Sequence, residues 1–97
     1  MEIFKRLNKK GYKHYYDGTV EELDSMDKDN QHLHSEIMQV IMWLYEKHGI
    51  WISVLQHTKN IEGKYFEAFV NSMTFSGYNS PTEAYEAAIE YVLTNLI

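Results

Sequence analysis

The hydrophobic positions of the chain follow a helical spacing in two long stretches, the first of which covers residues 30–48. Large apolar residues recur there every three or four positions, a spacing that places them on one face of a helix. Asn30 is a good N-cap residue, and Gly49 stands where a left-handed residue commonly ends a helix. The pattern therefore predicts a helix over residues 30–48. Its apolar face comprises Leu33, Ile37, Val40, Ile41, Leu44 and Tyr45.

The second helical stretch begins with a strong capping signal. Ser80 suits the N-cap and Pro81 the first helical position, and Glu83 can accept a hydrogen bond from the amide of the cap residue itself. These signals predict a helix over residues 81–96. Its apolar stripe comprises Tyr85, Ala88, Ile89, Val92, Leu93 and Leu96. The side chains expected to face water are Glu83, Glu86, Glu90 and Asn95.

Between the two helices the chain alternates in the manner of β-strands. Residues 50–57 are rich in β-branched and aromatic side chains, and residues 64–71 alternate in the same way. Residues 59–63 have the length and composition of a hairpin loop. Residues 71–72 have the composition of a tight turn, which leads into a third strand over residues 73–78.

These elements predict an α+β fold with two layers, in which both long helices cover one face of a three-stranded antiparallel sheet. The length suits one hydrophobic core, so we expect a single domain over residues 1–97. Residues 30–97 form its α-β-β-β-α core. Residues 1–29 form an N-terminal extension, with a short helix over residues 2–10 and one or two helical turns between Thr19 and Met26.

The other face of the predicted sheet has no helix to cover it. Its outward positions, which alternate with the buried ones, are Trp51, Leu55, Tyr65 and Phe69. Apolar residues that cluster on adjacent strands usually have a cover, so these four form a candidate partner-binding face. Three covers remain open: the N-terminal segment with its apolar and tyrosine side chains, a second copy or another protein, and the bases of single-stranded nucleic acid.

Basic residues gather at the start of the chain, and acidic residues follow them directly. The basic head consists of Lys5, Arg6, Lys9, Lys10 and Lys13. Residues 17–29 carry six acidic side chains, and the formal net charge of the chain is −5. The head either pairs with this acidic stretch or contacts the phosphates of a nucleic acid. We expect it to pair, because a net negative charge repels phosphate at long range.

The side chains offer little for catalysis or for metal binding. The absence of Cys excludes disulfides, thiolate zinc sites and thiol nucleophiles. His32 and Glu36 share one side of a helix, but two ligands do not make a metal site. Asp27 and Asp29 resemble the start of a calcium loop, but His32 stands where that loop needs Gly. We therefore expect no catalytic residue, no cofactor and no metal.

Two stretches in the second half of the chain carry a resemblance to known sequences. Residues 43–54 read WLYEKHGIWISV, and residues 79–97 read NSPTEAYEAAIEYVLTNLI. Both resemble a group of small uncharacterised, or hypothetical, proteins of Bacteroidetes and their phages. The resemblance implies a short phage or prophage product and carries no activity with it.

The order of helix, three strands and helix also resembles the double-stranded RNA-binding domain. That family binds phosphates through lysines at the start of its final helix. This chain has Ser80, Pro81, Thr82 and Glu83 there, so the resemblance extends to topology alone.

No apolar run approaches the roughly 18 residues that a membrane span requires, and the first ten residues lack the apolar core of a secretory signal. We therefore expect a cytoplasmic protein without membrane contact. The expected function is a non-catalytic protein-interaction or regulatory module that binds a protein partner or forms a homodimer. The alternative is a module that binds single-stranded nucleic acid through the aromatic sheet face and the basic head.

Overall fold

A computed structural model of the protein describes residues 2–56 and 66–97. The described part of the chain contains four helices and three strands. In chain order they are α1 (Ile3–Lys9), α2 (Val20–Ser25), α3 (Gln31–His48), β1 (Ile52–Gln56), β2 (Phe66–Val70), β3 (Met73–Tyr78) and α4 (Pro81–Asn95).

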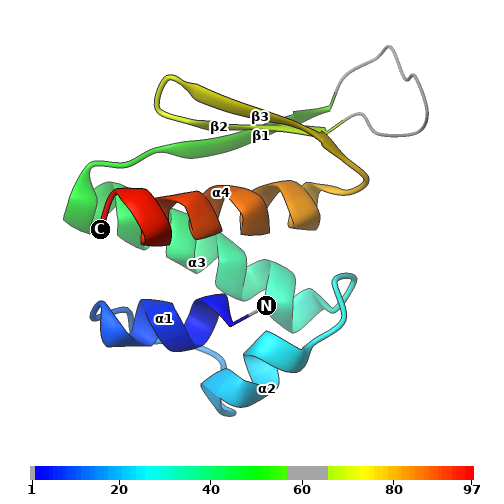
Figure 1. Cartoon of the computed structure of the whole chain (residues 1–97). Helices are drawn as coiled ribbons and strands as arrows, with labels where there is room; N and C mark the ends of the chain where they lie inside the picture. Colours follow the sequence, from blue (N-terminus) through cyan, green and yellow to red (C-terminus); the bar gives the residue numbers. More distant parts are fainter. Residues whose placement is uncertain (1, 57–65) are drawn as a thin grey trace.

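The described elements confirm the predicted α+β fold. The strands form an antiparallel sheet in the order β1-β2-β3. Figure 1 shows α3 and α4 on the same side of this sheet, with α4 lying directly against it and α3 alongside α4, farther from the strands. Inward-facing side chains of the strands, such as Ile52, Ala68 and Val70, are buried in one core together with apolar residues of both long helices.

The N-terminal extension packs on the side of the long helices that faces away from the sheet, as α1 and α2 (Figure 1). Ile3, Phe4, Leu7 and Tyr12 are all buried there as part of the core. The N-terminal segment therefore does not cover the outer face of the sheet, which excludes one of the three covers that the sequence left open.

Strand β1 begins later in the chain than the strand predicted over residues 50–57. Strand β1 starts at Ile52 rather than at residue 50, because the amide of Trp51 binds the side-chain Oδ1 of Asn71 at 3.2 Å instead of a backbone carbonyl. Residues 71–72 make the predicted tight turn, with Asn71 at a φ of 53°. The predicted loop at residues 59–63, together with residues 57, 64 and 65 of the predicted strands, lies outside the described residues.

Side chains cap the helices largely as predicted. The hydroxyl of Ser80 accepts from the amide of Glu83 at 3.2 Å, and Thr19 and Glu22 form a reciprocal capping box. Gly49 ends α3 in the left-handed conformation, with a φ of 65°. One detail is wrong: the carboxylate of Glu83 accepts from the amide of Asn79 at 3.1 Å, not from that of Ser80.

Helix α1 receives its cap from another helix. Asp24 of α2 accepts from the amide of Phe4 at 2.9 Å and from that of Lys5 at 3.1 Å. Burial raises the pKa of the Asp24 carboxyl, against the opposing effect of these two amides. This cap ties α1 to α2, since the residue before α1, Glu2, makes no side-chain cap itself.

Three residues of the long helices differ from the expected burial. Tyr45 was expected on the buried face of α3, but 54% of its surface is exposed. Leu96 is 44% exposed, because α4 ends at Asn95. Glu86, which was expected to face water, is buried in α4.

Candidate functional site

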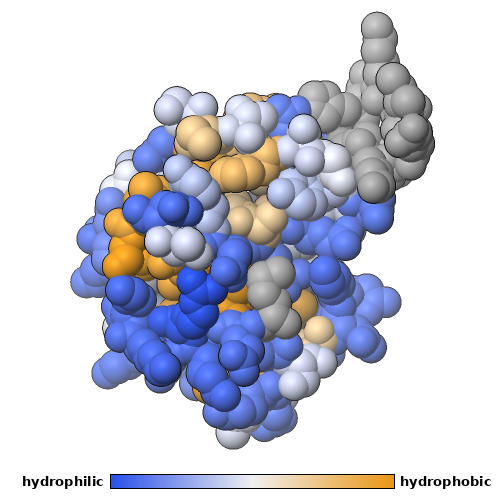
Figure 2. Space-filling model, viewed as in Figure 1, coloured by the Kyte–Doolittle hydropathy of each residue, from blue (hydrophilic) through white to orange (hydrophobic). Residues whose placement is uncertain are grey.

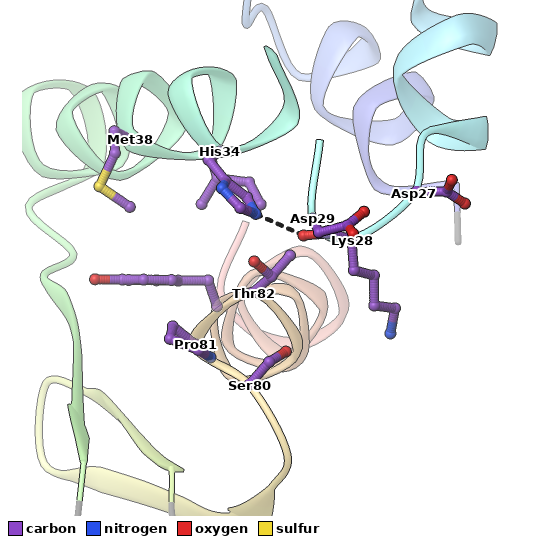
Figure 3. Close-up of a pocket in the computed structure, with 10 residues that line it drawn as sticks. Asp27, Lys28, Asp29, His34, Met38, Ser80, Pro81 and Thr82 are labelled. Atoms are coloured by element: carbon purple, nitrogen blue, oxygen red, sulfur yellow. Dashed lines mark hydrogen bonds between the residues drawn. The ribbon is translucent and has the colours of Figure 1, made fainter. Parts of the chain in front are cut away.

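A cavity of about 720 Å³ lies where the starts of α3 and α4 meet the loop that precedes α3. Figure 3 shows His34 and Met38 of α3 facing Pro81 and Thr82 of α4 across this cavity. The size falls within the range of roughly 300–1,000 Å³ that is typical of ligand pockets. Its lining residues are Asp27, Lys28, Asp29, His34, Ile37, Met38, Ser80, Pro81, Thr82 and Tyr85.

The capping signals of the two long helices shape the cavity. Asn30 turns the chain into α3 by accepting from the amide of His32 at 2.8 Å, and this turn holds the loop at residues 27–29 beside the first turns of α3. Ser80 and Pro81 start α4 at the opposite wall. Tyr85 lies one turn later, and burial raises the pKa of its phenol.

A hydrogen bond and two ion pairs fix the polar rim of the cavity. The Nε2 of His34 donates to the carbonyl oxygen of Lys28 at 2.5 Å (Figure 3). The ammonium of Lys28 lies 3.6 Å from Glu83 Oε1 and 3.5 Å from Glu86 Oε1. Within the described residues the buried Glu86 Oε1 accepts no hydrogen bond, so Lys28 supplies its compensating charge.

The other two charged groups of the rim are acids. Asp27 and Asp29 are exposed, and neither carboxylate has an ion-pair partner within residues 2–56 and 66–97. Because Lys28 is already shared between two glutamates of α4, the rim of the cavity carries an excess of negative charge.

A stripe of exposed apolar side chains leads along α3 away from the cavity. Met38, Met42 and Tyr45 follow the i, i+4, i+7 spacing that aligns side chains on one side of a helix, and they are 44%, 48% and 54% exposed. Trp51, at 47% exposure, packs edge-to-face on Tyr45 with ring centroids 5.4 Å apart. We call these four residues the α3 stripe. Met38 also lines the cavity, so the stripe and the cavity form one continuous surface.

The structure separates the residues of the predicted outer face. Leu55 and Phe69 lie on the outward side of β1 and β2, where Leu55 is 57% exposed. Polar residues surround them: Ser53 pairs with Phe69, and Glu67 pairs with Leu55. The ring of Trp51 packs against α3 instead. Tyr65 lies outside the described residues, so its place in this face stays a prediction.

Most of the basic head is engaged within the molecule. Arg6 pairs with Glu90 at 2.5 Å and donates to the hydroxyl of Thr94 at 3.1 Å. Lys5 lies within 4.0 Å of Glu2 and Glu21, and Lys10 donates to the carbonyl oxygen of Ile97 at 2.6 Å. The expected pairing with the acidic stretch thus holds for Lys5, whereas Arg6 and Lys10 contact the C-terminal part of the chain.

The remaining bases of the head, Lys9 and Lys13, are exposed and have no ion-pair partner among the described residues. Figure 2 shows that the surface over α1 and α2 is mostly hydrophilic, whereas hydrophobic residues gather between the sheet and α4 and near the C-terminus. Two free lysines make a small target for phosphate, since nucleic-acid binding relies on several such contacts.

One buried polar group was not found by sequence reasoning. Glu36 is 2% exposed, and its carboxylate accepts from the phenol of Tyr12 and from the amides of Tyr15 and Tyr16. Glu36 therefore anchors residues 12–16 to α3 and is not available as a metal ligand beside His32. The available signal was its position three residues after Leu33 and four before Val40, on the apolar face of the helix.

No group of three or more His, Asp or Glu side chains in residues 2–56 and 66–97 comes together as metal ligands do. Over the same residues, no helix combines the length and the apolarity that crossing a membrane requires.

Comparisons with known proteins gave no match to this chain. The chain matches no protein-family model, no curated protein and no solved structure.

Proposed function

We propose that the protein is a non-catalytic interaction module that binds another protein through the α3 stripe and the adjoining cavity. The observation that carries this proposal is the continuity of the two: Met38, Met42, Tyr45 and Trp51 are each about half exposed along one line, and that line ends in a cavity of about 720 Å³. The proposal keeps the expected kind of partner but moves the binding surface from the outer sheet face to α3.

The composition of the stripe supports a role in binding. Single exposed apolar residues are common on protein surfaces, but a contiguous apolar patch usually marks an interaction site. Methionine adapts its shape to a partner, and Tyr and Trp are enriched at protein interfaces. The buried face of α3 is formed by residues such as Leu33, Ile37 and Leu44, whereas Met42 and Tyr45 remain about half exposed outside it.

Two polar side chains of the cavity have contacts within the fold that explain them without catalysis. His34 holds the loop through the carbonyl of Lys28, and Lys28 compensates the charge of the buried Glu86. Both side chains therefore already have a role in the local structure. The proposal includes the cytoplasmic location expected from the sequence. It also includes a phage or prophage origin, which rests on the resemblance of residues 43–54 and 79–97.

Site-directed photo-crosslinking in cells that produce the full chain tests this proposal. A benzophenone amino acid at position 42 places the reactive group on the α3 stripe. The same amino acid at position 47 is the matched control, because Lys47 is exposed on α3 and lies five residues further along, about 140° around the helix.

We expect a discrete protein adduct from position 42 and none from position 47. The mass of the adduct distinguishes a second copy of the chain from a different protein. Equal labelling from both positions, no adduct from position 42, or an adduct that nuclease digests would each contradict the proposal.

A further inference from the structure

We infer that the segment bound by the α3 stripe is a cationic amphipathic helix of the partner protein, an inference that rests on the proposed function. Its apolar face would lie along Met38, Met42 and Tyr45, and its basic residues would meet the acidic rim of the cavity. The charge of the rim and the geometry of the stripe each support one half of this inference.

The charge of the rim selects a basic partner. Asp27 and Asp29 are exposed at the cavity and have no ion-pair partner within the described residues. The base next to them, Lys28, is held at 3.6 and 3.5 Å by Glu83 and Glu86. An acidic segment would meet uncompensated carboxylates here, whereas Lys or Arg side chains would pair with them.

Within the described residues, no Lys or Arg side chain of α3 lies beside the stripe to oppose such a partner. Lys47 lies nine residues after Met38, which places it on the opposite side of α3. The charged residue that flanks the stripe is Glu46, which is exposed. The acids at the cavity and Glu46 near the other end of the stripe thus have the same sign of charge.

The geometry of the stripe selects a helix. Met38 to Tyr45 spans two turns, or about 10 Å at 1.5 Å per residue, and runs straight along α3. A partner helix matches such a line with its own i, i+3, i+4 and i+7 side chains, the arrangement used when amphipathic helices bind in hydrophobic grooves. The cavity at one end of the stripe can accept a larger apolar side chain of that helix.

Fluorescence anisotropy with designed peptides tests the inference on the full chain. The probe is a labelled amphipathic peptide of Leu and Lys, about 18 residues long, or five helical turns. One comparison peptide has the same composition in a scrambled order without an apolar face. The other keeps the Leu positions and replaces every Lys by Glu.

Two double variants separate the contributions of apolar contact and charge. Met42→Ser with Tyr45→Ser removes the centre of the stripe, and Asp27→Asn with Asp29→Asn removes the unpaired acids. Asp17→Asn with Glu21→Gln is the matched control, since it changes the net charge equally at exposed positions around α2. Circular dichroism and urea melts establish that each variant is folded.

We expect the Leu/Lys peptide to bind and the scrambled peptide not to bind. The stripe variant should lose about tenfold or more in affinity, as central apolar anchors of an interface do. The Asp27/Asp29 variant should lose several-fold and show a weaker dependence of affinity on salt. The control variant should stay within about twofold of the unmodified chain, because neither residue lines the cavity and exposed charges are screened by salt.

The two proposals fail in different ways. If the Leu/Glu peptide binds as tightly as the Leu/Lys peptide and the Asp27/Asp29 variant is unaffected, the inference of a cationic helix is wrong, while the stripe remains the binding surface. If the stripe variant binds the Leu/Lys peptide as well as the unmodified chain does, the proposed binding surface itself is wrong. Failure of the Leu/Lys peptide to bind at all also overturns the inference.

Discussion

The side chain of Glu36 shows how a single acid can connect two parts of the molecule without a cationic partner. A buried carboxylate is costly unless hydrogen bonds replace its hydration. The amide of Tyr16 lies 2.7 Å from one of its oxygens, the amide of Tyr15 lies within 3.1 Å of both, and the phenol of Tyr12 supplies a third donor. Hydrogen bonds to a charged acceptor are stronger than those between neutral groups, so Glu36 stabilises the path of residues 12–16.

The substitution Glu36→Gln should destabilise the protein by about 1–3 kcal/mol. Glutamine has the same shape, but its amide nitrogen donates and so cannot accept from the backbone amides that meet it. Urea melts of the variant and of Glu46→Gln, an exposed control on the same helix, check this expectation. Equal midpoints for the two variants would show that the Glu36 contacts do not stabilise the fold.

The phenol of Tyr12 makes stability depend on pH in the alkaline range. Burial raises its pKa, and the hydrogen bond to Glu36 and the charge of that group raise it further. Above a pH of about 10 the unfolded chain loses this proton while the folded protein keeps it, so the free energy of unfolding falls as the pH rises.

The expected slope for Tyr12 is at most about 1.4 kcal/mol per pH unit, the value for one proton. Urea melts between pH 9 and 11 should show a smaller loss for Tyr12→Phe than for the unmodified chain. Tyr85, whose pKa burial also raises, contributes to the dependence that remains in the variant. Parallel curves for the two proteins would contradict the proposed protonation of Tyr12.

At the scale of single residues, the contacts that could be predicted from the sequence are those between residues close together in the chain. The caps at Thr19 and Ser80 were predictable because donor and acceptor lie three residues apart. The partners of the buried Glu36 and Glu86 were not predictable, because Tyr12 and Lys28 are distant from them in sequence. The burial of Tyr45 was predicted wrongly. A helical period predicts on which side of the helix a side chain lies, but not whether another element packs against it.

At the scale of elements, the start of α4 carries two roles. Ser80 satisfies the amide of Glu83, and the same turn forms one wall of the cavity. The two long helices were predicted to within a residue at their starts and ends, since capping and periodicity agree there. The predicted start of β1 was wrong by two residues, because the amide of Trp51 binds the side chain of Asn71 instead of a backbone carbonyl.

The substitution Ser80→Ala should lower the free energy of unfolding by about 1 kcal/mol, the usual effect of losing an N-cap. The matched control is Ser35→Ala, at an exposed interior position of α3 where alanine favours the helix. In guanidinium melts, the midpoint of Ser80→Ala should therefore fall, whereas that of Ser35→Ala should rise or stay unchanged. An unchanged midpoint for Ser80→Ala would contradict the capping role.

At the scale of the whole molecule, the packing of α1 and α2 against the long helices makes the extension part of the core. Deleting residues 2–16 would remove Ile3, Phe4, Leu7 and Tyr12, which are all buried. At about 1.5–3 kcal/mol for each such side chain, the loss approaches the whole stability of a typical domain, about 5–15 kcal/mol.

We therefore expect the deletion to abolish cooperative unfolding in urea and the near-ultraviolet circular dichroism signal. The control Lys9→Ser with Lys13→Ser changes exposed residues of the same segment and should leave both intact. A truncated chain that still unfolds cooperatively at a similar urea concentration would show that the extension is an appendage. The arrangement itself could not be read from the sequence, because an amphipathic α1 fits the outer sheet face and the helix layer equally well.

The ion pair between Arg6 and Glu90 joins residues 84 positions apart, and it has a consequence for synthesis on the ribosome. Helix α1 has seven residues, too few to be stable alone in water, and it packs against α4, which begins only at Pro81. Helix α1 must therefore wait for α4. Until α4 leaves the ribosome, Ile3, Phe4 and Leu7 have no complete burial site, and the nascent chain exposes them to chaperones while the residues between α1 and α4 are made.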